Sequence, residues 1–200
     1  MPKCLSCGER KGNRFCPVVN GDICSLCCGT KRQKDIECLP SCDYLKKGTA
    51  YQLDRDVEKK ISSDLHAESE DVFNRDDIAP FAMAIEGYFV DRFYPNRDVN
   101  DNHILQSMNR LFAFLSGTLP TLEPINNIEE LIYKEFREID RKTRTLPDRL
   151  KARAVLRIIK SIRTSSGGVL GNRNYLEMIY SQHTGKGKWA DLFTRLESSD

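Results

Sequence analysis

Long apolar runs are missing from this 200-residue chain. No stretch approaches the roughly 18–20 consecutive apolar residues that a helix needs to cross a bilayer. The first residues, Met1 to Cys4, also lack the apolar run of a secretory signal peptide. We therefore expect no membrane partner, and a reducing, cytoplasmic compartment follows if the cysteines described below bind zinc.

Recognisable catalytic motifs are also missing. The chain has three dispersed histidines, His66, His103 and His183, and contains neither His-Glu-x-x-His nor Gly-x-Ser-x-Gly. The Gly-rich segment 165–171 lacks the Gly-Lys-Ser/Thr ending of a phosphate-binding loop, so it predicts a turn between helices. Glu86 lies on a largely apolar segment and is expected to face solvent. These absences favour a protein that is not an enzyme.

Cysteine is abundant but confined to one end of the chain. All eight cysteines lie between Cys4 and Cys42, and the 158 residues that follow contain none. A Cys-x-x-Cys pair can point both sulfurs at one tetrahedral metal ion, and two such pairs complete a site. The predicted zinc ligands are Cys4, Cys7, Cys16, Cys24, Cys27, Cys28, Cys38 and Cys42.

Disulfides and an iron–sulfur cluster are the competing interpretations of this spacing. A Cys-x-x-Cys pair closes too short a loop for an ordinary structural disulfide, and the pair occurs twice. A catalytic zinc keeps one position open for water, whereas a structural zinc is closed by four protein ligands. Eight cysteines can close two sites, so the pattern predicts two structural zinc ions.

The sulfurs can be assigned to the two ions in more than one way. In a cross-braced arrangement the two Cys-x-x-Cys pairs hold one ion, and Cys16, Cys28, Cys38 and Cys42 hold the other. The adjacent residues Cys27 and Cys28 favour this arrangement, because neighbouring side chains point apart and can serve different ions. A sequential arrangement, or one ion with spare thiols, also fits the spacing.

The charge of residues 1–47 agrees with two ions. This segment holds nine Lys/Arg and five Asp/Glu, a formal charge of +4. Eight thiolates and two zinc ions would bring the loaded segment close to neutral. The basic residues of this segment would then compensate sulfur charge; the alternative is that Lys31 and Arg32 belong to a surface that binds nucleic acid.

Residues 4–45 resemble the cross-braced zinc fingers of the MYND and HIT types. The shared features are Cys4-x-x-Cys7, Phe15-Cys16-Pro17, Ile23-Cys24-Ser25-Leu26-Cys27 and Cys38-x-x-x-Cys42. The chain departs from both patterns, because it has no histidine ligand and because Cys16 and Cys28 stand in place of the second pair. The resemblance covers about a fifth of the chain. It implies a finger that docks on proteins and has no catalysis of its own.

The rest of the sequence predicts helices, because apolar residues recur every three or four positions and no segment alternates as a strand would. An Asn127-x-x-Glu130 capping box is expected to begin one of them. The expected helices span about residues 49–66, 80–94, 101–116, 127–145, 147–164, 174–183 and 188–196. The fold class is therefore mainly α, with a small N-terminal two-zinc Cys-rich finger followed by an all-α helical domain.

Three segments follow from this pattern. Residues 1–47 form the Cys-rich zinc-binding module, residues 48–77 an acidic connecting helix, and residues 78–200 the helical domain. The connecting segment is expected to bury Leu53, Val57, Ile61 and Leu65 along one stripe. Residues 54–77 contain nine Asp/Glu and four Lys/Arg, which gives a net charge of −5.

Residues 134–163 form a basic region, with eleven Lys/Arg and four Asp/Glu. At 100° per residue, four cations of the helix expected over 147–164 fall on one side, opposite its apolar residues. These cations are Arg149, Arg153, Arg157 and Lys160. Such a stripe can contact a phosphate backbone, an acidic protein surface or only solvent.

These features together predict a non-enzymatic zinc-binding protein that acts as a protein-interaction or adaptor module. The alternative is a nucleic-acid-binding protein that uses the basic helices of residues 134–163 together with the zinc finger.

Overall fold

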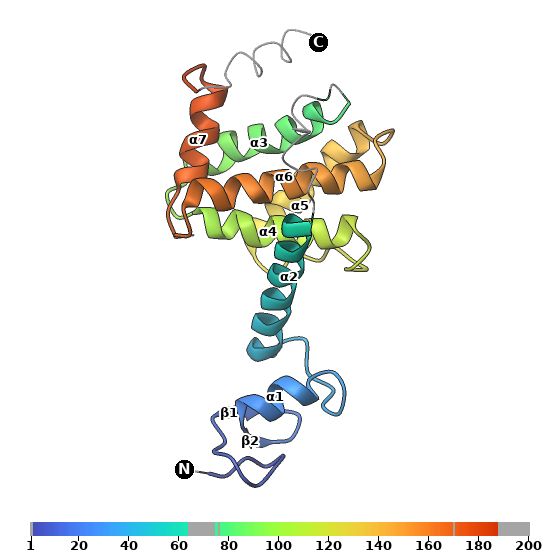
Figure 1. The fold of residues 1–200 in the computed structure, drawn as a ribbon, viewed down its shortest axis with the longest axis vertical. Helices are drawn as coiled ribbons and strands as arrows, with labels where there is room; N and C mark the ends of the chain where they lie inside the picture. The colour runs from blue at the N-terminus through green and yellow to red at the C-terminus, as the bar shows by residue number, and fades with distance from the viewer. Residues whose placement is uncertain (1, 64–74, 76, 170, 188–200) are drawn as a thin grey trace. The chain divides into compact units, whose positions relative to one another are not determined.

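The computed structural model of the protein describes residues 2–63, 75, 77–169 and 171–187. The chain is mainly α, as predicted, and the strands among the described residues are confined to a two-stranded sheet near the N-terminus (Figure 1). The chain divides into two compact units, Met1–Gln52 (the finger unit) and Leu53–Asp200 (the helical unit). The helix expected over 188–196 lies outside the described residues.

The finger unit contains a short hairpin and a short helix. Strand β1 (Arg14–Cys16) pairs antiparallel with β2 (Gly21–Ile23), and Cys16 lies opposite Gly21. Alternate residues of a strand point to opposite faces. Cys16 of β1 and Ile23 of β2 are accordingly buried, whereas Phe15, next to Cys16 on β1, is exposed. Helix α1 (Ser25–Lys31) follows directly after β2 and Cys24.

Helix α2 (Asp43–Ser63) begins directly after Cys42, earlier than the expected start at residue 49. Gly48 lies inside this helix and does not end it. Tyr44 packs against the buried residues of the finger unit, while Leu53 and Val57 are buried in the helical unit. The expected burial of Leu65 and the connecting role of residues 48–77 stay predictions, because 64–74 and 76 lie outside the described residues.

The remaining helices of the described residues agree closely with the expected ranges. They are α3 (Ala79–Phe93), α4 (Asp101–Leu115), α5 (Asn127–Lys142), α6 (Asp148–Ser166) and α7 (Asn174–His183). The expected cap of α5 was wrong by one position. The Asn126 side chain accepts from the N–H of Glu129 at 2.9 Å, and the Glu129 carboxylate accepts from the N–H of Ile125 at 3.0 Å.

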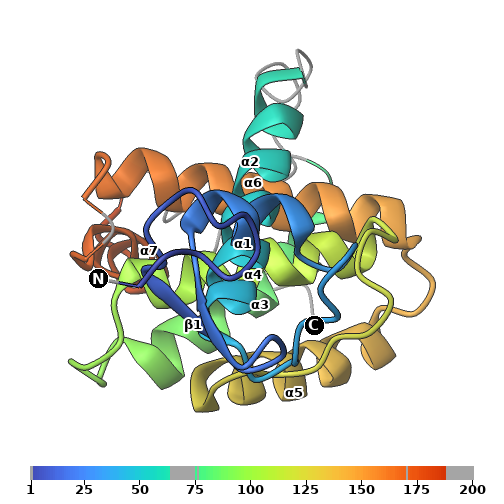
Figure 2. The same cartoon turned by 90° about the horizontal axis from the view of Figure 1, so that it is seen from below.

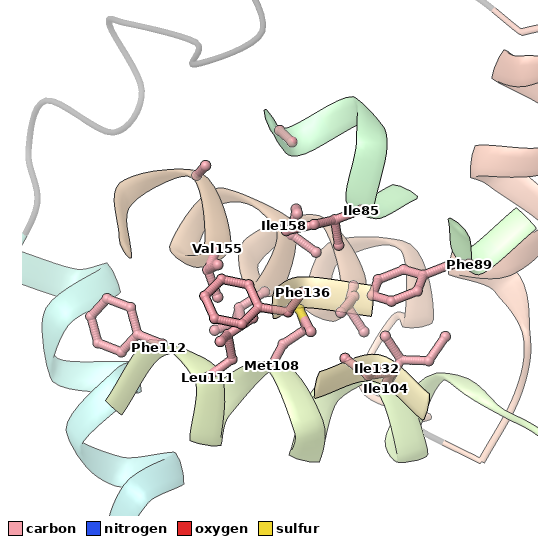
Figure 3. Close-up of a cluster of buried hydrophobic side chains, with 14 of the residues drawn as sticks. Ile85, Phe89, Ile104, Met108, Leu111, Phe112, Ile132, Phe136, Val155 and Ile158 are labelled. Atoms are coloured by element: carbon pink, nitrogen blue, oxygen red, sulfur yellow. The ribbon is translucent and has the colours of Figure 1, made fainter. Parts of the chain in front are cut away.

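The core of the helical unit lies where α3, α4, α5 and α6 converge. Helix α6 lies between α3 and α4 in Figure 1, and Figure 2 shows α5 on the side of α4 away from α6. Phe89, Met108, Phe136 and Ile158 come from four different helices and point toward one another (Figure 3). The prediction that the regularly spaced apolar residues form the buried face of each of these four helices is thereby confirmed.

Two buried acids join α7 to the rest of the helical unit. Asp101, at the start of α4, accepts from Ser166 Oγ at 2.7 Å and from the N–H groups of Tyr175 and Leu176 at 2.9 and 3.4 Å. The N-cap residue of α7, Arg173, offers no side-chain acceptor to the first N–H groups of the helix. Asp101 supplies this acceptor from α4. Glu86 is only 3% exposed and accepts from the Tyr175 hydroxyl at 2.8 Å, so the expectation that it faces solvent was wrong. Burial, with the negative charge of Glu86, raises the pKa of Tyr175.

We expect the substitution Asp101→Ala to lower the free energy of unfolding by about 3 kcal/mol, because it leaves one hydroxyl and two N–H groups without their acceptor in a buried site. Urea denaturation of the helical signal measures the loss. The exposed neighbour Asp98 is the control, and Asp98→Ala should change stability by less than about 0.5 kcal/mol. Equal effects of the two substitutions would show that Asp101 is not the cap of α7.

Candidate metal centre

Four sulfur atoms of the finger unit converge on one point. The Sγ atoms of Cys4, Cys7, Cys24 and Cys27, here called the first quartet, all lie within 4.8 Å of one another. A tetrahedral zinc ion with Zn–S bonds of about 2.3 Å holds its sulfurs about 3.8 Å apart. The first quartet therefore has the ligand number, the ligand type and nearly the spacing of a closed thiolate site.

Backbone hydrogen bonds shape the first Cys-x-x-Cys turn. The N–H of Cys4 donates to the carbonyl of Arg10 at 2.7 Å, and the N–H of Gly8 donates to the carbonyl of Cys4 at 2.8 Å. Gly8 has a φ of +68°, in the left-handed region that favours glycine. The chain thus reverses directly after Cys7, which places both sulfurs of the pair on the same side of the turn.

The second pair lies at the start of α1. Cys24 occupies the N-cap position, where its sulfur accepts from the N–H of Cys27 at 3.4 Å. The N–H of Cys24 in turn donates to the sulfur of Cys4 at 3.1 Å, which links the two pairs. Backbone N–H donors to sulfur favour the thiolate, which is the form that binds metal.

The thiols of the first quartet differ in acidity. Burial acts to raise the pKa of Cys4, but N–H donors from Cys24, Cys7 and Ser6 outweigh it and lower the pKa to about 6. A hydrogen bond with the Cys24 sulfur, together with burial, raises the pKa of Cys27 to about 11. Without a metal ion, at least one proton stays within the quartet at neutral pH. Metal binding at this quartet would displace that proton.

The remaining four cysteines lie around a second position, where their sulfurs are less closely gathered than in the first quartet. Cys16, Cys28, Cys38 and Cys42, here called the second quartet, line one cavity of about 10 Å³. They come from the end of β1, from α1 and from the segment between α1 and α2. Among the described residues, the first quartet is the group of three or more potential ligands whose ligand atoms all lie close enough to share one ion. The structure thus gathers the second quartet around a common space without bringing three or more of its sulfurs to mutual ligand distance.

The interior of the finger unit consists largely of sulfur. Five of its buried residues are cysteines, and the aliphatic side chains buried among the described residues of this unit are Ile23 and Ile36. All eight cysteines are free thiols. So small an apolar core supplies little folding free energy, and modules of this size depend on metal binding for it.

The predicted basic residues have different environments. Arg149 is exposed, whereas Arg153, Arg157 and Lys160 are half-buried on α6. Arg157 donates to Ser161, and Arg163 forms an ion pair with Glu58 of the acidic segment. The stripe therefore has contacts within the helical unit, and its binding to nucleic acid stays a prediction.

The structure gives specific partners to Lys151 and Arg32. Lys151 is only 3% exposed and forms ion pairs with Asp140 and Asp148. In the finger unit, Arg32 donates to the sulfur of Cys28 at 3.9 Å, and Lys31 beside it is half-buried. Charge counting along the sequence predicted that basic residues of the finger unit compensate sulfur charge, but it could not identify Cys28 as the partner of Arg32 or detect the ion pairs of Lys151.

Comparison of the chain with models of known protein families, with characterised proteins and with solved structures found no match. None of the described helices is both long enough and apolar enough to span a membrane.

We expect Cys24→Ser to remove metal from the finger unit and to unfold it, because it removes a sulfur of the first quartet while serine can still cap α1. The helical unit has its own core and should retain its melting transition. Metal analysis, limited proteolysis and circular dichroism measure the three effects. Ser25→Ala, at the exposed next position, is the control and should keep the metal. Loss of both units in one transition would mean that they fold as one.

Proposed function

We propose that this chain is a non-enzymatic zinc-binding protein of the reducing cytoplasm, whose finger unit acts as a protein-interaction or adaptor module. The observation that supports it best is the convergence of the first quartet, with four sulfurs within 4.8 Å of one another. Four thiolates close a tetrahedral site and leave no position for water or substrate. Such a site stabilises a fold and does not catalyse a reaction.

Zinc is the ion that fits these ligands best. Thiolates are soft ligands that select zinc or iron–sulfur clusters over magnesium, calcium or manganese. Closed sites of four cysteines that hold a small loop-rich module together are a common structural use of zinc. We propose that the first quartet holds one zinc ion and that the second quartet, already gathered around one cavity, holds another.

Exposed apolar side chains support a docking role for the finger unit. Nine large apolar residues are exposed in the described part of the chain, and seven of them belong to the finger unit. Those seven are Leu5, Phe15, Val18, Val19, Leu26, Leu39 and Tyr51. Leu5 and Phe15 are 65% and 59% exposed. Exposed apolar residues concentrated on one small unit are typical of surfaces that contact other proteins.

We expect the purified, reduced protein to contain two zinc ions per chain, because the eight thiolates can close two four-ligand sites. Elemental analysis combined with native mass spectrometry measures the ratio. The double substitution Cys38→Ser with Cys42→Ser should reduce it to one, since both residues belong to the second quartet. A wild-type ratio of one would leave the first quartet as the metal site and refute the second.

The docking role predicts that the exposed apolar residues of the finger unit are needed for partner binding. We expect Phe15→Thr with Leu26→Gln to lose protein partners in affinity purification, because it removes two exposed apolar side chains while keeping strand and helix propensity. The zinc content and the melting temperature should stay unchanged. The matched control is Ile125→Thr with Val169→Thr, which alters the exposed apolar residues outside the finger unit.

The same purification should be repeated after nuclease treatment. Partners that persist with nuclease and disappear in the finger variant support the adaptor role. If every partner is lost with nuclease, or if the two double variants behave alike, the adaptor role is wrong. Loss with nuclease would favour the basic helices of residues 134–163 as the binding surface instead.

A further inference from the structure

Arg32 has an unusual environment for a cation next to a helix end. It follows the last residue of α1, and its Nη2 donates to the sulfur of Cys28, in the second quartet, at 3.9 Å. Its Nε is buried and has no hydrogen-bond partner among the described residues. The guanidinium is thus directed into the finger unit and toward sulfur.

The backbone on both sides of Arg32 is held in a defined turn. Gln33 has a φ of +56°, and its N–H donates to the carbonyl of Ile36 at 2.9 Å. Arg32 and Ile36 also form an isolated β-bridge. The Gln33 side chain donates to the carbonyl of Cys38 at 3.4 Å. The turn that presents Arg32 is therefore tied to a second cysteine of the same quartet.

Gly48 of α2 leaves the space that the guanidinium occupies. A methyl group at this position would overlap Nη1 of Arg32 and would lie 2.6 Å from its Cζ. Glycine is a poor residue for the interior of a helix such as α2, and no positive φ requires it here. The close approach of Arg32 explains why a residue without a side chain occupies position 48 of this helix.

We propose that Arg32 is a positioning residue of the second zinc site, where its guanidinium compensates thiolate charge from the outer shell, and that Gly48 makes room for it. This inference rests on the proposed function, in which the second quartet binds zinc. Four thiolates and one Zn²⁺ leave a charge of −2, and a cation that donates to a ligand sulfur stabilises that charge. The site is thus completed by a residue that does not bind the metal.

The first quartet has a comparable cation. Burial acts to lower the pKa of Arg10, but the charges of Cys7 and Cys24 outweigh it and raise the pKa. Arg10 thus interacts electrostatically with the first quartet, whereas Arg32 donates directly to a sulfur of the second. Arg14, another cation near the second quartet, lies over the Tyr44 ring at 4.7 Å instead.

The test uses the full chain loaded with Zn²⁺ and treated with increasing concentrations of a zinc chelator. Cysteines that lose their metal are alkylated and mapped by mass spectrometry, so that each quartet reports separately. We expect Arg32→Gln to weaken zinc binding at the second quartet by about 10-fold or more, the usual effect of removing an outer-shell partner. The first quartet should release its zinc at the wild-type chelator concentration.

Four further variants separate charge, shape and position. Arg32→Lys keeps the charge and should recover part of the affinity, whereas Lys31→Gln removes a neighbouring cation and should change nothing. Gly48→Ala should resemble Arg32→Gln, because it displaces the guanidinium without altering it. Gly29→Ala is its control, since a methyl group there meets nothing within 4 Å.

The outcomes distinguish this inference from the function on which it rests. If the wild type protects only one quartet, the two-zinc function is wrong and the role of Arg32 falls with it. If the wild type protects both quartets and Arg32→Gln releases zinc as the wild type does, only the inference is overturned. If Arg32→Gln fails to fold, wild-type release in Gly48→Ala overturns it instead.

Discussion

Four sulfur atoms within 4.8 Å of one another cannot all become thiolates unless a cation lies among them. This electrostatic constraint governs the finger unit. Its buried interior holds five cysteines and two isoleucines among the described residues, so apolar burial alone offers little to stabilise it. We infer that metal binding supplies the missing free energy of folding, and that the hairpin, the first turn and α1 are arranged to bring sulfurs to one point.

The same constraint explains where cations of the finger unit lie. Thiolates around a divalent ion keep a net negative charge, and buried charge needs partners. If both quartets bind zinc as proposed, Arg32, which donates to Cys28, would meet this need at the second quartet, and Arg10 would meet it at the first. A basic residue in a Cys-rich module can therefore be part of the metal site, even when it lies where a nucleic-acid contact would be expected. The placement of Gly48 in α2 follows from the same requirement.

The helical unit uses buried charge in a different way. Asp101 stabilises the first turn of α7 and accepts from Ser166, and Glu86 accepts from Tyr175. Apolar contacts are not directional, whereas hydrogen bonds of this kind require a defined orientation of the groups that form them. They specify which end of α7 meets α4. Within the described residues, these buried acids therefore have structural partners that account for their position.

The sequence alone determined the helical class, the approximate helix ranges and the eight candidate metal ligands, four of which the structure brings together, because periodicity and short ligand spacings are local properties of the chain. Tertiary structure decided the rest. The first quartet unites turns about twenty residues apart in the sequence, Arg32 meets Gly48 of the next helix, and Asp101 caps α7 from α4. Such partners meet only through folding, so local patterns could not reveal them. Tyr175, which donates to the buried Glu86, likewise comes from another helix.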